Sequence, residues 1–190
     1  MNILLLGPQG AGKGTQAKRI AAEYGLQHIA SGDLYRAAIA SRSDLGRRVE
    51  PILAAGELVP DEITIPLIRS EIEGSEEGFV LDGYPRNLAQ AEALDEMLEQ
   101  IDRPLSIEVL LELDDEVARD RLLKRAELEG RPDDTPEVIG RRLETYHRDT
   151  EPVVEHYRVR GNLVQVHGDR PVEEVWAEIS EALSAVEARA

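Results

Sequence analysis

The segment Met1-Asn-Ile-Leu-Leu-Leu-Gly-Pro-Gln-Gly-Ala-Gly-Lys-Gly-Thr15 predicts how this chain folds. Its apolar run Asn2–Leu6 lacks alternating polar residues, which is typical of a strand buried on both faces of a sheet. A glycine-rich turn follows, and we expect a helix to begin near Lys13. A strand, a glycine-rich turn and a helix, in this order, form the context that a phosphate-binding loop, or P-loop, requires.

The turn also has the composition that phosphate binding needs. Glycines let the backbone curl so that successive N–H groups point at phosphate oxygens, and the helix adds its positive dipole end. Lys13 supplies a charge for the β- and γ-phosphates. A glycine-rich turn without a ligand fits less well, and so does a dinucleotide loop, which needs no lysine. The segment therefore indicates nucleotide binding, with one departure: Gly14 separates Lys13 from Thr15.

Beyond this segment, short apolar runs alternate with longer amphipathic segments. The further runs that predict strands are 26–29, 78–81, 106–113 and 163–166. Apolar residues at helical spacing predict helices over 16–24, 87–100, 116–127, 135–158 and 172–189. This alternation predicts an α/β fold, in which helices wrap a doubly wound parallel sheet of five strands.

Two stretches depart from simple alternation. Residues 31–74 have a helical pattern almost throughout, with turns near Ser43, Gly56 and Pro60. We therefore expect a helical insert between the second and third strands. Residues 127–136 are polar and contain one glycine and two prolines, so they predict a loop between two helices.

The composition limits the classes of partner. The chain has 190 residues, enough for one domain with a full core, and a formal net charge of −16. That charge argues against a protein that coats nucleic acid or anionic membrane, because phosphate is repelled at long range. Without cysteines, disulfides and thiolate zinc sites are impossible. No stretch reads as a signal peptide or as a membrane span of about 20 apolar residues, so we expect a cytoplasmic protein. No large exposed apolar face is evident in the sequence, so we expect a monomer.

A second chemical signal is the apolar run Gly78-Phe-Val-Leu-Asp82, which ends in a carboxylate. P-loop proteins that transfer phosphoryl groups hold Mg²⁺ with such an aspartate, usually through water. Taken alone, Asp82 could equally begin the turn that continues with Gly83. Because it accompanies a P-loop, we interpret it as the magnesium residue.

Basic side chains gather in residues 119–148, which hold eight of the 22 lysines and arginines, with seven acids among them. Ion-paired helix faces account for Arg141 and Arg148. The others suit phosphoryl transfer, whose barrier falls when cations spread over the transferred group. Guanidinium binds phosphate oxygens in pairs, and Arg36 and Arg86 are further candidates. The four histidines form no triad or cluster, and we interpret them as structural or exposed: His28, His147, His156 and His167.

Several phrases follow the P-loop in a fixed order. They are Ser31-Gly-Asp-Leu-Tyr-Arg36, Gly56-Glu-Leu-Val-Pro60, Leu81-Asp-Gly-Tyr-Pro-Arg86 with Gln90 four residues on, Gly130-Arg-Pro-Asp-Asp134 and Arg142-Leu-Glu-Thr-Tyr146. In order and spacing they resemble the adenylate kinases over essentially the whole chain. The resemblance implies reversible phosphoryl transfer from Mg-ATP to AMP, giving two ADP, and a role in adenine nucleotide homeostasis.

The resemblance assigns residues to an ATP site. The loop that would hold the ATP phosphates comprises Gly10, Ala11, Gly12, Lys13, Gly14 and Thr15. Arg121 and Arg125 would cover ATP, the first near its adenine and the second near its phosphates, and the backbone at Arg170 would lie by the adenine. Mg²⁺, held by Asp82 through water, is the implied cofactor, and no structural zinc is expected.

The resemblance also assigns an AMP site. Its residues would be Ser31, Arg36, Glu57, Leu58, Val59, Gly83, Tyr84, Pro85, Arg86 and Gln90, with Arg131 and Arg142 reaching the phosphates that are joined. Gln90 would pair with the adenine ring, and Arg36 and Arg86 would bind the AMP phosphate. The residues that would act in catalysis, by spreading the charge of the transition state, are Lys13, Arg86, Arg125, Arg131 and Arg142.

The resemblance divides the single domain, residues 1–190, into three parts. They are a core of residues 1–29, 60–126 and 137–190, a monophosphate-binding insert of residues 30–59, and a lid of residues 127–136. The lid would be the short kind. Longer lids in the family carry a small β subdomain, sometimes with a cysteine zinc site, and this chain has neither the length nor the cysteines.

Two departures keep alternatives open. Position 31 is Ser where adenylate kinases usually have Thr, and Asn87 also occurs in the related UMP/CMP kinases. Those relatives usually have Ala in place of Ser31 and lack an equivalent of Gln90, so AMP is favoured and a UMP/CMP-type kinase is the alternative. A P-loop ATPase or switch is less consistent with the sequence, because it usually has Ser or Thr where Gly14 stands.

Overall fold

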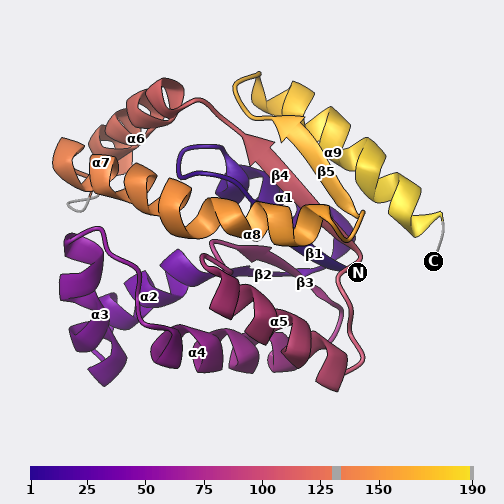
Figure 1. Cartoon of the computed structure of the whole chain (residues 1–190), viewed down its shortest axis with the longest axis horizontal. Helices are drawn as coiled ribbons and strands as arrows, with labels where there is room; N and C mark the ends of the chain where they lie inside the picture. The colour runs from indigo at the N-terminus through magenta and orange to yellow at the C-terminus, as the bar shows by residue number, and fades with distance from the viewer. Residues whose placement is uncertain (130–133, 189–190) are drawn as a thin grey trace.

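The computed structural model describes residues 1–129 and 134–188, and a parallel sheet of five strands runs through them (Figure 1). The strands are β1 (Asn2–Leu6), β2 (Gln27–Ala30), β3 (Phe79–Asp82), β4 (Ile107–Glu112) and β5 (Leu163–His167). Their order is β2-β3-β1-β4-β5, so β1 lies in the middle. The predicted α/β fold is confirmed, including the short strand expected over 26–29.

The strand register brings the two chemical signals of the sequence together. Every neighbouring pair of strands is parallel, so all carboxyl ends lie on one edge of the sheet. Leu5 pairs with Asp82, which places the carboxylate at the end of β3 beside the start of the P-loop. Ligand sites of open α/β sheets form at this edge.

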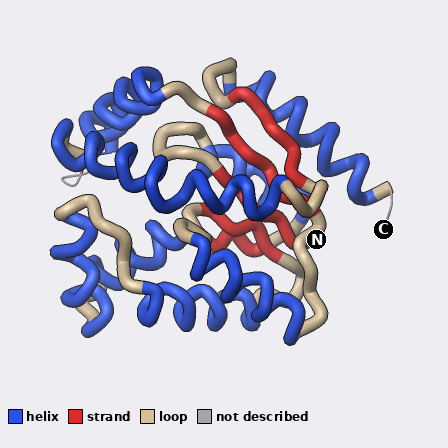
Figure 2. The backbone as a smooth tube through the Cα atoms, viewed as in Figure 1, coloured by secondary structure: helices blue, strands red, loops and turns tan. Residues whose placement is uncertain are grey.

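Helices connect successive strands and cover both faces of the sheet (Figure 2). Their bounds are α1 (Lys13–Tyr24), α2 (Ser31–Ala40), α3 (Asp44–Ala54), α4 (Asp61–Gly74), α5 (Leu88–Gln100), α6 (Asp115–Glu129), α7 (Pro136–Thr145), α8 (Glu151–Arg158) and α9 (Val172–Glu187), with a π-helical turn, η1 (Tyr146–Thr150), before α8.

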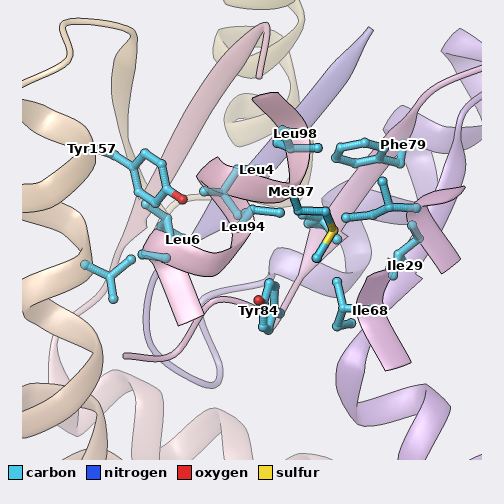
Figure 3. Packing of buried hydrophobic residues seen from close by; sticks show 14 of the residues in the cluster. Leu4, Leu6, Ile29, Ile68, Phe79, Tyr84, Leu94, Met97, Leu98 and Tyr157 are labelled. Carbon is cyan, nitrogen blue, oxygen red and sulfur yellow. The ribbon is translucent and has the colours of Figure 1, made fainter. Parts of the chain in front are cut away.

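The strands are buried on both sides, which explains their unbroken apolar runs. Ile3 and Leu5 pack in a core shared with α1 and α9, where the side chain of Trp176 lies. Leu4 and Leu6 point to the other face and pack against α4, α5 and α8 (Figure 3). This two-sided burial anchors the edge of the sheet that carries the P-loop.

The helical insert expected over residues 31–74 forms α2, α3 and α4. Helix α2 begins at the end of β2, and α3 lies beside it (Figure 1). They approach closely at Gly46, where a Cβ atom would collide with the carbonyl oxygen of Ala38. Ser43 caps α3 by accepting a hydrogen bond from the Gly46 backbone N–H.

The structure corrects two predicted boundaries. The single helix expected over 135–158 is three elements, α7, η1 and α8, and Pro152 lies in the first turn of α8, where its missing N–H is tolerated. The loop expected over 127–136 is shorter, because good helix formers carry α6 on to Glu129. Residues 130–133 of the expected lid lie outside the described residues.

Candidate active site

The P-loop curls because three of its glycines adopt backbone angles that other residues avoid. Gly10 and Gly12 have φ of 86° and 94°. Gly7, with φ of 130°, lies so close to the carbonyl oxygen of Leu111 on β4 that a Cβ would clash with it. Helix α1 begins at Lys13, as expected, so the curled loop leads directly into the positive end of a helix dipole.

Lys13 is held inside the loop it follows. Its Nζ donates hydrogen bonds to the carbonyl oxygens of Gly7 at 2.7 Å and Pro8 at 2.8 Å. Burial lowers the pKa of Lys13 to about 8, against the attraction of Asp82, which raises it. The loop therefore presents a cation whose charge depends on pH in the slightly alkaline range.

Asp82 lies among cations at the end of β3. Burial alone would raise the pKa of its carboxyl, but His28, Lys13 and Arg86 together hold the pKa below its ordinary value. The imidazole Nε2 of His28 is 3.9 Å from Oδ2 of Asp82, which is too far for a hydrogen bond. The carboxylate is therefore ionised at neutral pH.

The donor atoms near Asp82 fit a magnesium ion that takes most of its ligands from elsewhere. A Cβ at Gly14 would lie 3.4 Å from Oδ2 of Asp82, so the loop backbone approaches the carboxylate closely. Within the described part of the chain, no group of three or more histidine, cysteine or acidic residues could form a metal cage. Mg²⁺ keeps several waters and binds one or two carboxylates plus substrate phosphates, so one carboxylate is a suitable contribution.

A cleft of about 770 Å³ opens above the P-loop. Among the described residues that line it, eight are basic and four are acidic, although the chain as a whole carries −16. The basic ones are Lys13, Lys18, Arg36, Arg86, Arg121, Arg125, Arg142 and Arg170, and the acidic ones are Asp33, Glu57, Asp82 and Asp169. The cleft therefore attracts anions within an otherwise acidic molecule.

Helix α6 contributes two of these arginines. Arg121 donates to the carbonyl oxygen of Gly168 at 2.7 Å and lies 3.4 Å from that of Gly10, so it links the P-loop to the turn after β5. Arg125, one helical turn further on, donates from Nε and Nη2 to Oδ2 of Asp134 at 2.9 and 2.7 Å. Both guanidinium groups face the cleft.

Asp134 joins α6 to α7. Its side chain is fully buried, and its carboxylate also binds Nη1 of Arg142, which α7 contributes. Because Arg125 and Arg142 come from different helices, a single carboxylate holds together two cations that would otherwise repel each other. Such shared bonds fix the position of both guanidinium groups.

Arg86 and Arg36 approach from the opposite side of the cleft. Arg86 is anchored through its Nε, which donates to the carbonyl oxygen of Gly83 at 2.7 Å, and burial lowers its pKa from the ordinary value. Arg36 on α2 pairs with Asp33 and is 40% exposed. A half-buried arginine held by the backbone is thus accompanied by a more exposed one.

A smaller pocket continues from the cleft between α2, α4 and the turn after β3. It is lined by Ser31, Tyr35, Leu53, Glu57, Leu58, Val59, Thr64, Gly83, Arg86 and Gln90. Ser31 donates to the Gly83 carbonyl oxygen at 2.6 Å, and the hydroxyls of Tyr35 and Thr64 lie 2.7 Å apart. The pocket therefore combines apolar walls with polar groups that are already paired.

The structure brings most of the predicted site residues together in these two connected spaces. Lining one or both are Gly10, Ala11, Gly12, Lys13, Gly14, Thr15, Ser31, Arg36, Glu57, Leu58, Val59, Asp82, Gly83, Pro85, Arg86, Gln90, Arg121, Arg125, Arg142 and Arg170. Tyr84 differs: its ring lies in the core (Figure 3), and its hydroxyl donates to the Gln90 carbonyl oxygen. Arg131 lies outside the described residues.

Sequence reasoning missed several residues of the site. His28 was interpreted as structural or exposed, yet it lines the cleft beside Asp82. Its place at the start of a short strand next to β3 was the available signal. Tyr35 and Thr64 line the smaller pocket, and Asp134 bridges two arginines. No spacing rule predicts such pairings, because they join segments that meet only in the fold.

Nothing in the described residues provides a helix that is both apolar enough and long enough to cross a lipid bilayer.

Known proteins resemble this chain over nearly its whole length. A family model described as "Adenylate kinase" matches residues 5–162. An adenylate kinase of Synechococcus sp. (strain RCC307) is 46% identical over 182 residues, covering 96% of this chain and 98% of that protein. One from Thermus thermophilus is 48% identical over 181 residues, covering 95% and 96%. One from Caulobacter vibrioides is 46% identical over 190 residues, covering 99% and 100%.

Proposed function

This chain belongs to the adenylate kinase family and is an enzyme that transfers a phosphoryl group between ATP and AMP, and from this premise we propose that the transfer takes place in the cleft above the P-loop. The observation that carries the proposal is convergence: Lys13, Arg86 and the Arg125–Arg142 pair line one cleft from three sides. Two polyanions can meet end to end only where several cations offset their repulsion.

In this proposal ATP occupies the P-loop side. The backbone of Gly10–Thr15 and the ammonium of Lys13 hold its phosphates, and Arg125 adds a charge from α6. Arg121 and the backbone at Arg170 lie toward the adenine. The side chain of Arg170 is paired with Glu178, which leaves its backbone as the part available to the nucleotide.

AMP occupies the opposite side, along the smaller pocket. Arg36 and Arg86 bind its phosphate, and Ser31, the backbone of Glu57–Val59 and the turn Gly83–Arg86 surround the nucleotide. Gln90 lies against the base. Support comes from the pocket itself, which is lined by Ser31, Val59 and Gln90 and opens toward Arg86.

Mg²⁺ is the cofactor that this site suits, and Asp82 is the residue that would hold it through water. Bound to ATP, the ion would neutralise phosphate charge as transfer proceeds. The chain's own residues supply the rest. Lys13, Arg86, Arg125 and Arg142 bind and orient both phosphate chains, and Arg131 completes the set that the family resemblance implies.

The chemistry needs no strong general base and no covalent enzyme intermediate. The attacking AMP phosphate is already ionised at neutral pH, so an in-line displacement at the γ-phosphorus requires chiefly alignment and charge neutralisation. Water is the competing acceptor. Movement of the insert, residues 30–59, and of helices α6 and α7 over the cleft would exclude water.

The choice of acceptor favours AMP over other monophosphates. Ser31 and Gln90 lie together in the smaller pocket, as an adenine site requires. A UMP/CMP-type acceptor is the alternative, and a panel of AMP, CMP, UMP and GMP with ATP and Mg²⁺ decides between them. We further propose that the enzyme is cytoplasmic and acts as a monomer. Light scattering of the purified protein would test its oligomeric state.

Replacing Arg86 with Ala tests the site. We expect kcat for ADP formation from ATP and AMP to fall at least 100-fold, because removing one preorganised charge from a transition state costs about 3 kcal/mol. The matched control is Arg148→Ala, because Arg148 is 70% exposed and pairs with Asp149 away from the cleft. A coupled assay with and without Mg²⁺ gives the rates. Equal turnover in the two variants would remove Arg86 from the mechanism.

A further inference from the structure

Gln90 belongs to a hydrogen-bond network in which each partner can play only one role. The residue is 2% exposed and lines the smaller pocket. The backbone N–H of Arg86 donates to its Oε1 at 2.8 Å, and its Nε2 donates to Oδ1 of Asp61 at 2.7 Å. A backbone N–H can only donate, and an ionised carboxylate can only accept.

This arrangement fixes which end of the amide is oxygen. A glutamine amide is nearly symmetric in shape and can turn over when its surroundings allow. Turning the amide of Gln90 would set its NH₂ group against the N–H of Arg86 and its oxygen against the carboxylate of Asp61. Both contacts would become repulsive, so the present orientation is strongly preferred.

Asn87 holds the carboxylate of Asp61 in place. Its Nδ2 donates to Oδ1 of Asp61 at 3.0 Å, while its own Oδ1 accepts from the backbone N–H of Gln90 at 2.8 Å and caps α5. Asp61 opens α4, so the contact ties the start of one helix to the start of the next. The acceptor that faces Gln90 is therefore well defined.

The orientation of this amide decides which purine can pair with it. Adenine presents an acceptor at N1 and a donor at its 6-amino group, whereas a 6-oxo purine presents a donor at N1 and an acceptor at position 6. After its two protein bonds, the amide of Gln90 keeps one N–H and one oxygen lone pair. A fixed amide can match only one of these edges, while a freely turning amide could match both.

We propose that Asp61 is a specificity-determining positioning residue, which holds the Gln90 amide in the orientation that accepts adenine and rejects 6-oxo purines. This inference rests on the proposed function, in which Gln90 lies against the base of AMP. Asp61 itself acts through Gln90.

A simpler role for Asp61 makes a different prediction. An acidic residue in the first turn of a helix favours the helix dipole, and Asp61 and Glu62 both occupy the first turn of α4. If Asp61 only stabilised α4, replacing either residue would lower stability alike and leave the choice of base unchanged. Glu62 is exposed, and its substitution is therefore the matched control.

The experiment compares AMP with inosine monophosphate (IMP), which differs from AMP only along the edge in question. The value of kcat/KM is measured for each acceptor with saturating Mg-ATP, and the KM of ATP is measured in parallel. The proteins compared are wild type, Asp61→Ala, Asp61→Asn, Glu62→Ala and Gln90→Ala. We expect Asp61→Ala to lower the ratio of kcat/KM for AMP to kcat/KM for IMP about tenfold, because it removes one hydrogen bond to a charged group. The KM of ATP should stay within about twofold.

The other variants separate the explanations. Asp61→Asn keeps an oxygen acceptor and should retain most of the ratio, and Glu62→Ala should retain all of it. Gln90→Ala should also lower the ratio. If the ratio is unchanged in Gln90→Ala, the base does not lie against Gln90, and both the proposed AMP site and the role of Asp61 are wrong. If Gln90→Ala lowers the ratio and Asp61→Ala does not, the inference is wrong. Equal losses in Asp61→Ala and Asp61→Asn would also overturn it, because charge and not the acceptor would then matter.

Should Asp61→Ala fail to fold, Asp61→Ser serves in its place. The side chain of serine is one bond shorter than that of aspartate and does not reach Gln90, yet it keeps a polar group in the first turn of α4. The same fall in the AMP/IMP ratio is expected from it, and an unchanged ratio would contradict the inference.

Discussion

Lys13 is a half-buried cation whose hydrogen-bond partners in the P-loop are two carbonyl oxygens, those of Gly7 and Pro8. The ammonium gives up hydration without gaining a full counter-charge, and its pKa of about 8 follows from this. A bound phosphate would supply the missing negative charge and raise that pKa again. Nucleotide binding and protonation of Lys13 are therefore linked.

The linkage gives ATP binding a pH dependence whose sign is fixed. Below pH 8 Lys13 is already protonated and binds phosphate at no cost, whereas above pH 8 binding must first recover a proton. We expect the Kd of ATP to rise about fivefold from pH 8 to pH 9. Isothermal titration without AMP measures it.

Lys13→Met is the control for this experiment. It should bind ATP more weakly at every pH and show a flat profile over the same interval. A wild-type Kd that stays constant between pH 8 and pH 9 would show that Lys13 keeps its proton in the free enzyme.

At the scale of elements, one buried carboxylate links α6 to α7. Asp134 lies between Arg125 and Arg142, and a small apolar cluster that includes Leu122 and Leu143 also packs between the two helices. Without the carboxylate, two guanidinium groups would face each other at close range. Helices α6 and α7 would then move apart, and Arg125 and Arg142 would leave their positions beside the cleft.

We therefore expect Asp134→Ala to affect stability and catalysis together. The free energy of unfolding should fall by about 1–3 kcal/mol, because a charged hydrogen-bond partner is lost, and kcat should fall at least tenfold. Urea unfolding and the coupled assay measure the two effects. The control is Asp120→Ala, which removes an exposed acid from α6. Wild-type kcat in Asp134→Ala would mean that the bridge does not position the arginines.

At the scale of the whole molecule, a surface of net negative charge surrounds a cleft lined mainly by basic residues. The net charge of −16 makes the folded chain repel itself, and the repulsion is strongest at low ionic strength. Salt screens exposed charges more effectively than the buried pairs that Asp134 makes with Arg125 and Arg142. Stability should therefore increase with salt even though individual ion pairs weaken.

The melting temperature tests this expectation. Between about 10 and 200 mM NaCl we expect it to rise by about 2–4 °C, which corresponds to roughly 1 kcal/mol for a chain of this size. Differential scanning calorimetry measures the change, and a series with an uncharged osmolyte separates screening from solvent exclusion. A melting temperature that falls with NaCl would show that attractive pairs outweigh the repulsion.

Much of this architecture could be predicted from local patterns. The unbroken apolar run Asn2–Leu6 and the glycines after it indicated a buried strand and a P-loop, and the carboxylate at the end of the run Gly78–Asp82 indicated its partner. The structure confirms the strands and the position of Asp82 beside the glycine-rich loop, and each of these predictions depends on a few neighbouring residues. The short apolar run at 26–29 predicted β2 to within one residue of its bounds, Gln27–Ala30.

Other features could not be predicted because they depend on contacts between distant segments. The π-helical turn before α8 interrupts a pattern that otherwise has helical spacing. Tyr84 lies within a phrase assigned to the nucleotide, yet its ring fills the core (Figure 3). The roles of Asp134 and Asp61 follow from partners on other helices, and periodicity in a single sequence contains no information about these pairs.

The central place of β1 has a consequence for biosynthesis. As the chain leaves the ribosome, β1 emerges before both strands that flank it, and it must wait until residues 79–82 and 107–112 have been synthesised. During that interval an apolar strand with two unpaired edges is available to chaperones and to other nascent chains. Translation speed through the segment that encodes α2 to α5 thus sets how long the most vulnerable part of the polypeptide stays unprotected.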